Sequence, residues 1–468
     1  MNIVMEQQKS NIQFVNLKIQ NLLHRFEVDR AVFFGLFARI LAFCAGPITA
    51  ILIVAKFTPE IQGYHYTFLT ILAFQSAVDL GFGTVVIQFA SHEWSKLKLN
   101  KNGQIVGCAD ALSRLVSIAN ISMRWYLAAS FIVIFGLGLG GYIFFSNSPN
   151  IGINWQIPWF ILCILTGMGF CLIPVWSLLE GCNQVKKVYT FRFIQSAVVN
   201  LSIWGAILFG ANLWTATVSS AVSLICSIIF LRGQYWSFLN TLLFGIPSGP
   251  RINWRTHMLP MQWRFAISVF TGLFITSIFT PIMFKYHGPV MAGQMGMTWS
   301  LVNILGLASS WLNPKRPQFG MLVAQKKYIE LDRLFWKLTK IVLVLTLLLG
   351  LVIYILVLVI NNFNVAFAHR LLPPLPTGLF LIAQCFVMSS MTFSMYMRAH
   401  KKEPIMLLNV FGAILTISFV WLFGKYYAAV GMALAYLLVV LIIIPLIFLI
   451  WYRCKNKWQS ETLELYHG

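Results

Sequence analysis

Acidic residues are scarce in this 468-residue chain, which has 13 Asp and Glu against 34 Lys and Arg. The sequence contains no glycine-rich phosphate loop with a lysine, no histidine-rich metal spacing and no pair of acids in a predicted external loop. These absences argue against an enzyme, and no cofactor is expected. None of the eight cysteines falls in a predicted external loop, so they indicate packing residues and not a disulfide framework.

Long apolar runs dominate what is present, and 59% of the residues are hydrophobic. A hydrocarbon core of roughly 30 Å needs about 20 helical residues, and continuous apolar runs of that length are helices and not barrel strands. The predicted fold is therefore all-α and membrane-embedded, with about 12 transmembrane helices. The expected spans are 31–56, 64–90, 125–145, 158–182, 190–211, 215–231, 265–285, 289–312, 338–360, 376–397, 404–424 and 428–451.

Positive charge is confined to the two tails and to alternate gaps between these spans. The exceptions are Arg39, Lys56, Lys285, Arg370 and Lys425. By the positive-inside rule both termini are cytoplasmic, which agrees with an even number of spans. The net charge of +21 is spread over short juxtamembrane loops, so it indicates contact with anionic membrane lipids and not with nucleic acid.

The chain repeats itself weakly at an offset of 230 residues. Pro59 and Gly63 before the second span correspond to Pro289 and Gly293 before the eighth. With six spans per half, this predicts two lobes related by an axis along the membrane normal, which rock against each other to give alternating access. The expected organisation is an amphipathic cytoplasmic segment 1–30, an N-terminal lobe 31–232, a linker 233–262, a C-terminal lobe 263–452 and a cytoplasmic tail 453–468.

Two segments, 13–29 and 103–122, place apolar residues at helical spacing against Lys, Arg and Asn. This pattern predicts in-plane helices on the cytoplasmic leaflet. The alternative is a soluble connector helix.

Two charges lie deep within predicted spans, Arg39 and Asp79. At 1.5 Å per residue, Arg39 lies about 13 Å from the cytoplasmic end of the first span and Asp79 about 16 Å from that of the second. The two spans are antiparallel neighbours, so the two side chains could pair. One interpretation is a static salt bridge. The other is that Arg39 binds an anionic group in a central cavity, with Asp79 as its partner or as a coupling site, since the arginine fork suits phosphate.

Further candidates for substrate binding surround this pair. Gln75 lies one turn before Asp79 on the same face, while His65 and Tyr66 offer hydrogen-bonding aromatic surface of the kind that sugars need, unless they belong to an interfacial aromatic belt. Lys285 and Arg264 are weaker candidates, because cations near helix ends often only snorkel.

Three prolines within spans predict kinks with a possible gating role: Pro47, Pro174 and Pro281. Near the cytoplasmic end of the fourth span, Glu180 is predicted to be a local charge partner beside Lys186 and Lys187.

Four short motifs carry a resemblance to a known family: Phe57–Tyr64, Leu80–Gly83, Leu179–Asn183 and Met397–Lys402. In these stretches, and over about 30–450, the chain resembles the Wzx-type polysaccharide flippases of the multidrug/oligosaccharidyl-lipid/polysaccharide exporter superfamily. The resemblance implies a V-shaped pair of six-helix lobes in a bacterial inner membrane, with Arg39 in the position of a cavity cation. The lipid II flippase branch resembles the same fold but typically has two extra C-terminal helices. The twelve spans expected here do not include them, which argues against a peptidoglycan precursor as the substrate.

The function expected from this resemblance is translocation of an undecaprenyl-pyrophosphate-linked oligosaccharide to the outer leaflet for O-antigen, capsule or exopolysaccharide assembly. Candidate protein partners are a polysaccharide polymerase and a chain-length regulator. Two alternatives remain open at this point: a cation-coupled multidrug exporter of the same superfamily, and a non-transporting scaffold of a polysaccharide assembly complex. An exporter of cationic drugs would favour acidic residues in its helices. The excess of cations in this chain therefore argues against the exporter.

Overall fold

The computed structural model describes residues 45–100, 104–147, 152–243, 245–312, 315–363, 367–400 and 404–467. Helices make up almost all of this part of the chain, and the only sheet within it is the antiparallel hairpin of β1 (Leu97–Leu99) and β2 (Ile105–Gly107). The predicted segment 1–30, including the in-plane helix 13–29, and Arg39 lie outside the described residues.

Eight helices of the described residues are long and apolar enough to cross a membrane, and one bent pair makes a ninth. Two of the eight each hold two predicted spans, joined at breaks in the backbone at Gly288 and at Tyr427–Ala428. With the short helix Ala45–Lys56, the described part of the first predicted span, they account for the twelve predicted segments. The prediction of an all-α, multi-pass membrane fold is confirmed.

The N-terminal lobe holds the first six spans. After Ala45–Lys56 its helices are α3 (Pro59–Leu72), α4 (Gln75–Asp79), α5 (Phe82–Trp94), α6 (Ala109–Ile132), the π-helical turn η1 (Val133–Leu137), α7 (Gly138–Ser146), α8 (Gln156–Phe170), α9 (Ile173–Gly181), α10 (Val185–Leu208) and α11 (Trp214–Leu243).

The C-terminal lobe holds the other six. Its helices are η2 (Trp254–Met258), α12 (Leu259–Ser277), α13 (Phe279–Val302), the 3-10 helix η3 (Asn303–Trp311), α14 (Arg316–Ala324), α15 (Tyr328–Asn362), the 3-10 turn η5 (Ala368–Arg370), α16 (Pro374–Ala399) and α17 (Met406–His467).

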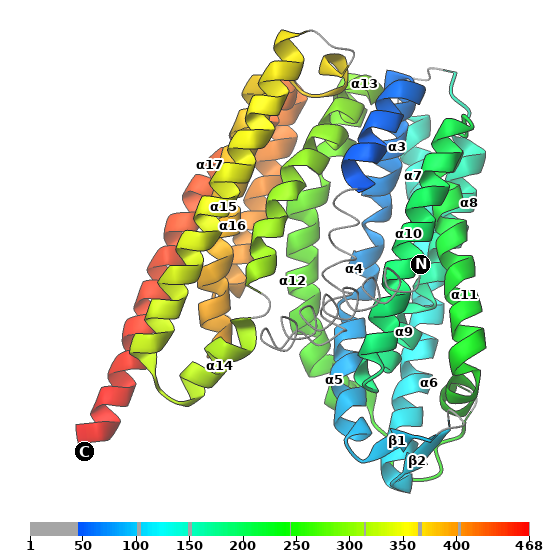
Figure 1. Cartoon of the computed structure of the whole chain (residues 1–468), viewed down its shortest axis with the longest axis vertical. Helices are drawn as coiled ribbons and strands as arrows, with labels where there is room; N and C mark the ends of the chain where they lie inside the picture. Colours follow the sequence, from blue (N-terminus) through cyan, green and yellow to red (C-terminus); the bar gives the residue numbers. More distant parts are fainter. Residues whose placement is uncertain are drawn as a thin grey trace, which may run out of the picture.

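The two lobes converge at one end of the molecule and diverge toward the other (Figure 1). They meet where α3 and α13 pack side by side, here called the α3–α13 end. The opposite end carries the β1–β2 hairpin, α14 and the C-terminus, and is here called the hairpin end. The arrangement agrees with the two-lobed layout predicted from the repeat.

The second predicted span, 64–90, is not one straight helix. Leu80 and Gly81 adopt left-handed backbone conformations (φ 51° and 67°), and the two halves of the span differ in direction by 45°. The halves pack in different cores: Tyr64 and Phe68 of α3 belong to a cluster with α13, whereas Phe82 of α5 packs within the N-terminal lobe.

The prediction of a separate in-plane helix over 103–122 is wrong. The hairpin strand β2 occupies Ile105–Gly107, and a continuous helical segment then runs from Ala109 through α6, η1 and α7 to Ser146. No glycine or proline occurs between Ala109 and Phe135, so nothing interrupts the helical hydrogen bonds where the amphipathic segment passes into the apolar one.

Candidate functional site

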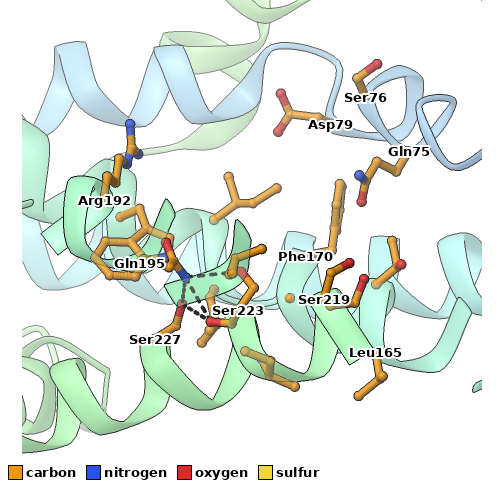
Figure 2. A pocket seen from close by; sticks show the side chains of 18 residues that line it. Gln75, Ser76, Asp79, Leu165, Phe170, Arg192, Gln195, Ser219, Ser223 and Ser227 are labelled. Atoms are coloured by element: carbon orange, nitrogen blue, oxygen red, sulfur yellow. Dashed lines mark hydrogen bonds between the residues drawn. The ribbon is translucent and has the colours of Figure 1, made fainter. Parts of the chain in front are cut away.

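A polar cavity of about 640 Å³ lies within the N-terminal lobe, bounded by α4, α8, α9, α10 and α11 (Figure 2). It is a feature of one lobe and not of the space between the lobes. The polar side chains that line it are Gln75, Ser76, Asp79, Thr166, Arg192, Gln195, Ser219, Ser220, Ser223 and Ser227.

Asp79 reaches this cavity from the last residue of α4, directly before the break in the second span. The left-handed turn at Leu80 and Gly81 aims the first amides of the next helix back at the carboxylate, and the backbones of Gly81 and Gly83 hydrogen-bond to it. Amides at the start of a helix favour a negative charge. The break therefore builds a place for a carboxylate at this depth.

Tyr126 of α6 provides the side-chain partner of Asp79, donating its hydroxyl to the carboxylate. The tyrosine is fully buried, so this bond fixes the carboxylate against the lobe interior. Gln75 lines the same cavity as Asp79, as their spacing of four residues predicted. The predicted partner Arg39 lies outside the described residues.

Gln195 organises the opposite wall of the cavity. Its Nε2 donates to the carbonyl oxygen of Ser223 (2.8 Å) and lies 3.1 and 2.9 Å from the hydroxyls of Ser223 and Ser227 (Figure 2). This group was not predicted from the sequence. Its signal was the serines at 219, 223 and 227, which fall four residues apart and so share one face of α11.

Arg192 and Glu180 form an ion pair of 2.5 Å at the rim of this cavity. Glu180 was predicted to be a local charge partner, and its described partner is Arg192 and not Lys186 or Lys187. The pair leaves Asp79 as the cavity-lining charge without a cationic partner among the described residues.

A second cavity, of about 540 Å³, lies between the lobes and contains His65 and Tyr66. Pro47, Asn200 and Ser300 line it as well, so it brings together Ala45–Lys56, α3, α10 and α13. His65 is buried, and its Nδ1 has no hydrogen-bond partner among the described residues. The structure thus places His65, Tyr66 and Pro47 together, apart from Gln75 and Asp79.

The α3–α13 end is closed by polar contacts between the lobes. Gln62 is 1% exposed and donates to the carbonyl oxygens of Gly293 (3.0 Å) and Arg370 (3.1 Å). Arg370 in turn donates to the carbonyl oxygen of Phe57 (2.5 Å) and to Gln62 Oε1 (3.3 Å). Burial lowers the pKa of Arg370, and the nearby carboxylate of Glu60 raises it.

Lys285 and Arg264 line none of these cavities. Lys285 is exposed with its ammonium 5.7 Å from the centre of the Tyr286 ring, and Arg264 is exposed beside the Trp263 ring. Among the described residues, no three His, Cys, Asp or Glu side chains gather as a metal site would require.

Two of the three predicted prolines follow interruptions of their helices. Pro174 comes after the turn at Cys171–Leu172, between α8 and α9, and Pro281 after the bend at Ile278, between α12 and α13. A proline removes the hydrogen bond to the carbonyl four residues earlier, which accounts for both positions. Pro47 lies in the helix Ala45–Lys56, and the residue whose carbonyl it would leave unbonded, at position 43, is outside the described residues.

No protein-family model matches the chain, and no curated protein does either. Solved structures do match. An inward-facing multidrug resistance MATE transporter of the MOP superfamily has a TM-score of 0.64 and 12% identity, covering 89% of this chain and 95% of that one. The lipid II flippase MurJ, in an inward closed conformation, has a TM-score of 0.55 and 16% identity. The match covers 92% of this chain and 90% of that one.

A third match is a MOP superfamily transporter from Pyrococcus furiosus, described as having a binding pocket of reversed polarity. Its TM-score is 0.56 at 11% identity, with 92% of this chain and 95% of that one covered. At such low identity these likenesses establish the fold alone. The chain has the two-lobed helical fold that MATE transporters and the MurJ flippase share.

Proposed function

We propose that this protein is a flippase that moves a polyprenyl-pyrophosphate-linked oligosaccharide from the cytoplasmic to the outer leaflet of a bacterial inner membrane. The observation that carries the proposal is the asymmetry of the two ends. The lobes are joined at the α3–α13 end by Gln62, Arg370 and Gly293, and diverge at the hairpin end. That asymmetry is what one state of an alternating-access cycle requires.

Loop charges support an orientation for this state. The hairpin end carries Lys98 in β1, and Lys326 and Lys327 between α14 and α15. By the positive-inside rule this end faces the cytoplasm, so the lobes are open to the side on which the substrate is made.

The chemistry of the N-terminal cavity supports an oligosaccharide as the group handled there. Its wall combines Gln75, Gln195 and several serine hydroxyls, which match the hydroxyl groups of a sugar, while the polyprenyl tail stays in the bilayer. Burying a charged headgroup in hydrocarbon is prohibitive, so a wet polar path between the lobes is a physical requirement. Membrane lipids, a polymerase and a chain-length regulator remain the proposed partners.

Arg39 is the first proposed contact for the pyrophosphate, with Asp79 as its partner or as a coupling site. His65, Tyr66 and Gln75 are proposed contacts for the sugar, and Pro47, Pro174 and Pro281 for gating. Lys285 and Arg264 stay weaker candidates for substrate binding, because both are exposed and line neither cavity.

The test is the leaflet distribution of lipid-linked oligosaccharide in spheroplasts of a deletion strain. We expect accumulation on the cytoplasmic face, relieved by the wild-type protein but not by Arg39→Ala at equal expression. Arg333→Ala removes an exposed cation of α15 and is the matched control, expected to complement fully. Unchanged distribution in the deletion strain would refute the flippase.

One observation favours the second candidate, a cation-coupled multidrug exporter. Asp79 places a carboxylate in the N-terminal cavity, where a cationic drug or a coupling ion would find a partner. The same deletion strain separates the two functions, since an exporter predicts a normal leaflet distribution with new sensitivity to cationic drugs.

A further inference from the structure

Two exposed lysines converge at the α3–α13 end of the C-terminal lobe, although they are far apart in the chain. Lys285 lies in α13 just before the break at Gly288, and Lys425 lies in α17 just before the break at Tyr427–Ala428. Their ammonium nitrogens are 5.7 and 5.8 Å from the centre of the same ring, that of Tyr286. The fold therefore brings two cations to one aromatic side chain.

Two hydrogen bonds hold the ends of these helices together beside the lysines. Trp421 Nε1 donates to the hydroxyl oxygen of Tyr286 (3.0 Å), and His287 Nε2 donates to the carbonyl oxygen of Gly424 (2.7 Å). Because the Tyr286 oxygen accepts the indole N–H, its own hydrogen is left to donate to a third group. The surface formed by these rings and lysines is here called the Tyr286 patch: Lys285, Tyr286, Trp421, Lys425 and Tyr426.

The protein does not offset the positive charge of the patch. Within the described part of the chain, neither Lys285 nor Lys425 forms an ion pair. In the predicted turns at this end the whole sequence has one acidic residue, Glu60, which lies near Arg370. Two ammonium groups that converge repel each other, and an anion bound between them would turn this repulsion into attraction.

The patch lies where a lipid-facing surface of α17 ends. Leu407, Phe411, Ile414 and Trp421 are between 46 and 76% exposed, and their spacing places them on one face of the helix. Lys425 follows Trp421 by one turn and continues that face. Exposed apolar side chains on a membrane-spanning helix contact lipid tails, while Trp, Tyr and Lys near the end of a span lie at the level of the lipid headgroups.

We propose that the Tyr286 patch binds the phosphate of an anionic phospholipid of the bilayer. Lys285 and Lys425 contact the phosphate oxygens, since a flexible four-carbon stem lets each ammonium reach a shared anion. The Tyr286 hydroxyl is the third donor. By the positive-inside rule the site faces the outer leaflet. Binding of a bilayer lipid here does not depend on which substrate the protein moves, so this site and the proposed flippase can fail separately.

The test is photocrosslinking of phosphatidylglycerol, with a diazirine beside its glycerol backbone, to the purified full chain in phosphatidylcholine nanodiscs. Cyanogen bromide cleaves at methionine and releases 284–291 and 407–432 even from lysine variants, so mass spectrometry can measure the yield on each peptide. We expect the double variant Lys285→Ala/Lys425→Ala to lower this yield about fivefold or more, because each lysine strengthens binding to an anionic lipid.

Lys56→Ala is the matched control, since it removes an exposed lysine from the same end of the N-terminal lobe. Its yield on the two peptides should stay within about twofold of wild type. Equal yields in the wild type and the double variant overturn the proposal. So does a wild-type yield that is no higher than that of a phosphatidylcholine carrying the same diazirine.

Tyr286→Phe provides a second test if the double variant does not fold. It removes only the third donor and should lower the yield about twofold or more, and an unchanged yield counts against the site. Thermal unfolding of each variant in the same nanodiscs shows that the chain is intact.

Competition identifies the source of the phosphate. We expect excess unlabelled phosphatidylglycerol to displace the probe from both peptides, and the same excess of phosphatidylcholine to leave it bound. Displacement by farnesyl diphosphate at a concentration at which phosphatidylglycerol has no effect would assign the Tyr286 patch to a diphosphate lipid and overturn its assignment to bilayer phospholipid.

Discussion

Gly63 and Gly293 occupy equivalent positions in the two halves of the chain and pack directly against each other. A Cβ atom on Gly293 would lie 3.0 Å from the backbone nitrogen of Gly63, and one on Gly63 would lie 1.9 Å from the carbonyl oxygen of Pro289. The internal repeat thus meets itself at the α3–α13 end, where glycine lets the two backbones approach.

Replacing Gly63 should open this end. In Gly63→Ala the new methyl group collides with the backbone of Pro289, so α3 and α13 must separate, at a cost of about 1–3 kcal/mol to the closed state. We expect a longer distance between spin labels placed on α3 and α13, measured by double electron–electron resonance. Gly205→Ala is the control, because a Cβ there has open space around it. An unchanged distance distribution in Gly63→Ala contradicts the contact.

Arg370 and Gln62 should act as a coupled pair. Arg370→Ala removes the guanidinium bonds to Gln62 Oε1 and to the carbonyl oxygen of Phe57. Gln62→Ala removes the same bond to the guanidinium, and also the bonds to the carbonyl oxygens of Gly293 and Arg370. Because the two side chains share one hydrogen bond, their effects on the opening equilibrium should be non-additive by about 0.5–3 kcal/mol. The measurement is the labelling rate of a cysteine introduced at Met297, which lies against Gln62 and is 1% exposed in the closed state, in the single and double variants. Strictly additive rates would show that the two residues do not hold the end together.

The sequence sufficed for the spans and the repeat because continuous apolar runs and the paired Pro and Gly residues are local signals. The same signals could not show that Gly63 and Gly293 touch. That contact depends on how the two lobes pack, and nothing in either local stretch encodes its partner.

The break at Leu80 escaped prediction for a different reason. Leucine rarely adopts a left-handed backbone, so a Leu–Gly step inside an apolar run reads as helix. The partners of Asp79 and Gln195 were also beyond reach: Tyr126 and the serines of α11 follow 47 and 28 to 32 residues later, on helices whose rotation is set by packing. The error at 103–122 arose because an in-plane helix and the polar end of a long span share one periodicity.

Tyr126 should affect transport by holding the carboxylate of Asp79 in place. Tyr126→Phe removes only the hydroxyl that the carboxylate accepts from, and a hydrogen bond to a charged group is worth about 1.5–3 kcal/mol. We expect Tyr126→Phe and Asp79→Asn each to reduce oligosaccharide flipping, and the double variant to be no worse than Asp79→Asn alone. Tyr142→Phe changes a half-exposed tyrosine elsewhere in the lobe and serves as control. Additive losses would mean that Tyr126 acts independently of Asp79.

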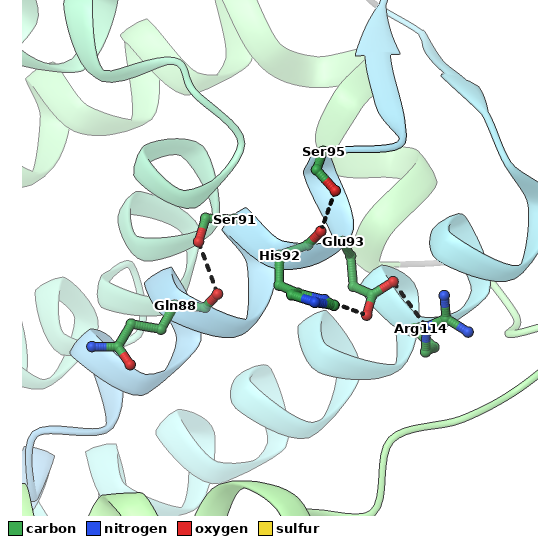
Figure 3. A network of polar contacts seen from close by, with 6 residues as sticks. All are labelled: Gln88, Ser91, His92, Glu93, Ser95 and Arg114. Atoms are coloured by element: carbon green, nitrogen blue, oxygen red, sulfur yellow. Dashed lines mark hydrogen bonds and ion pairs between the residues drawn. The ribbon is translucent and has the colours of Figure 1, made fainter. Parts of the chain in front are cut away.

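Glu93 and Arg114 should stabilise the hairpin end of the N-terminal lobe. Glu93 of α5 bonds Arg114 of α6 at 2.8 Å, and only 8% of its side chain is exposed (Figure 3). Glu93→Gln leaves the guanidinium facing a neutral amide in a largely buried setting, so stability should fall by about 1–3 kcal/mol. Glu330→Gln breaks an exposed pair with Lys327 (3.7 Å), where the expected change is below about 1 kcal/mol. The unfolding temperatures of both variants in detergent test the contrast, and equal losses would show that burial does not strengthen the Glu93 pair.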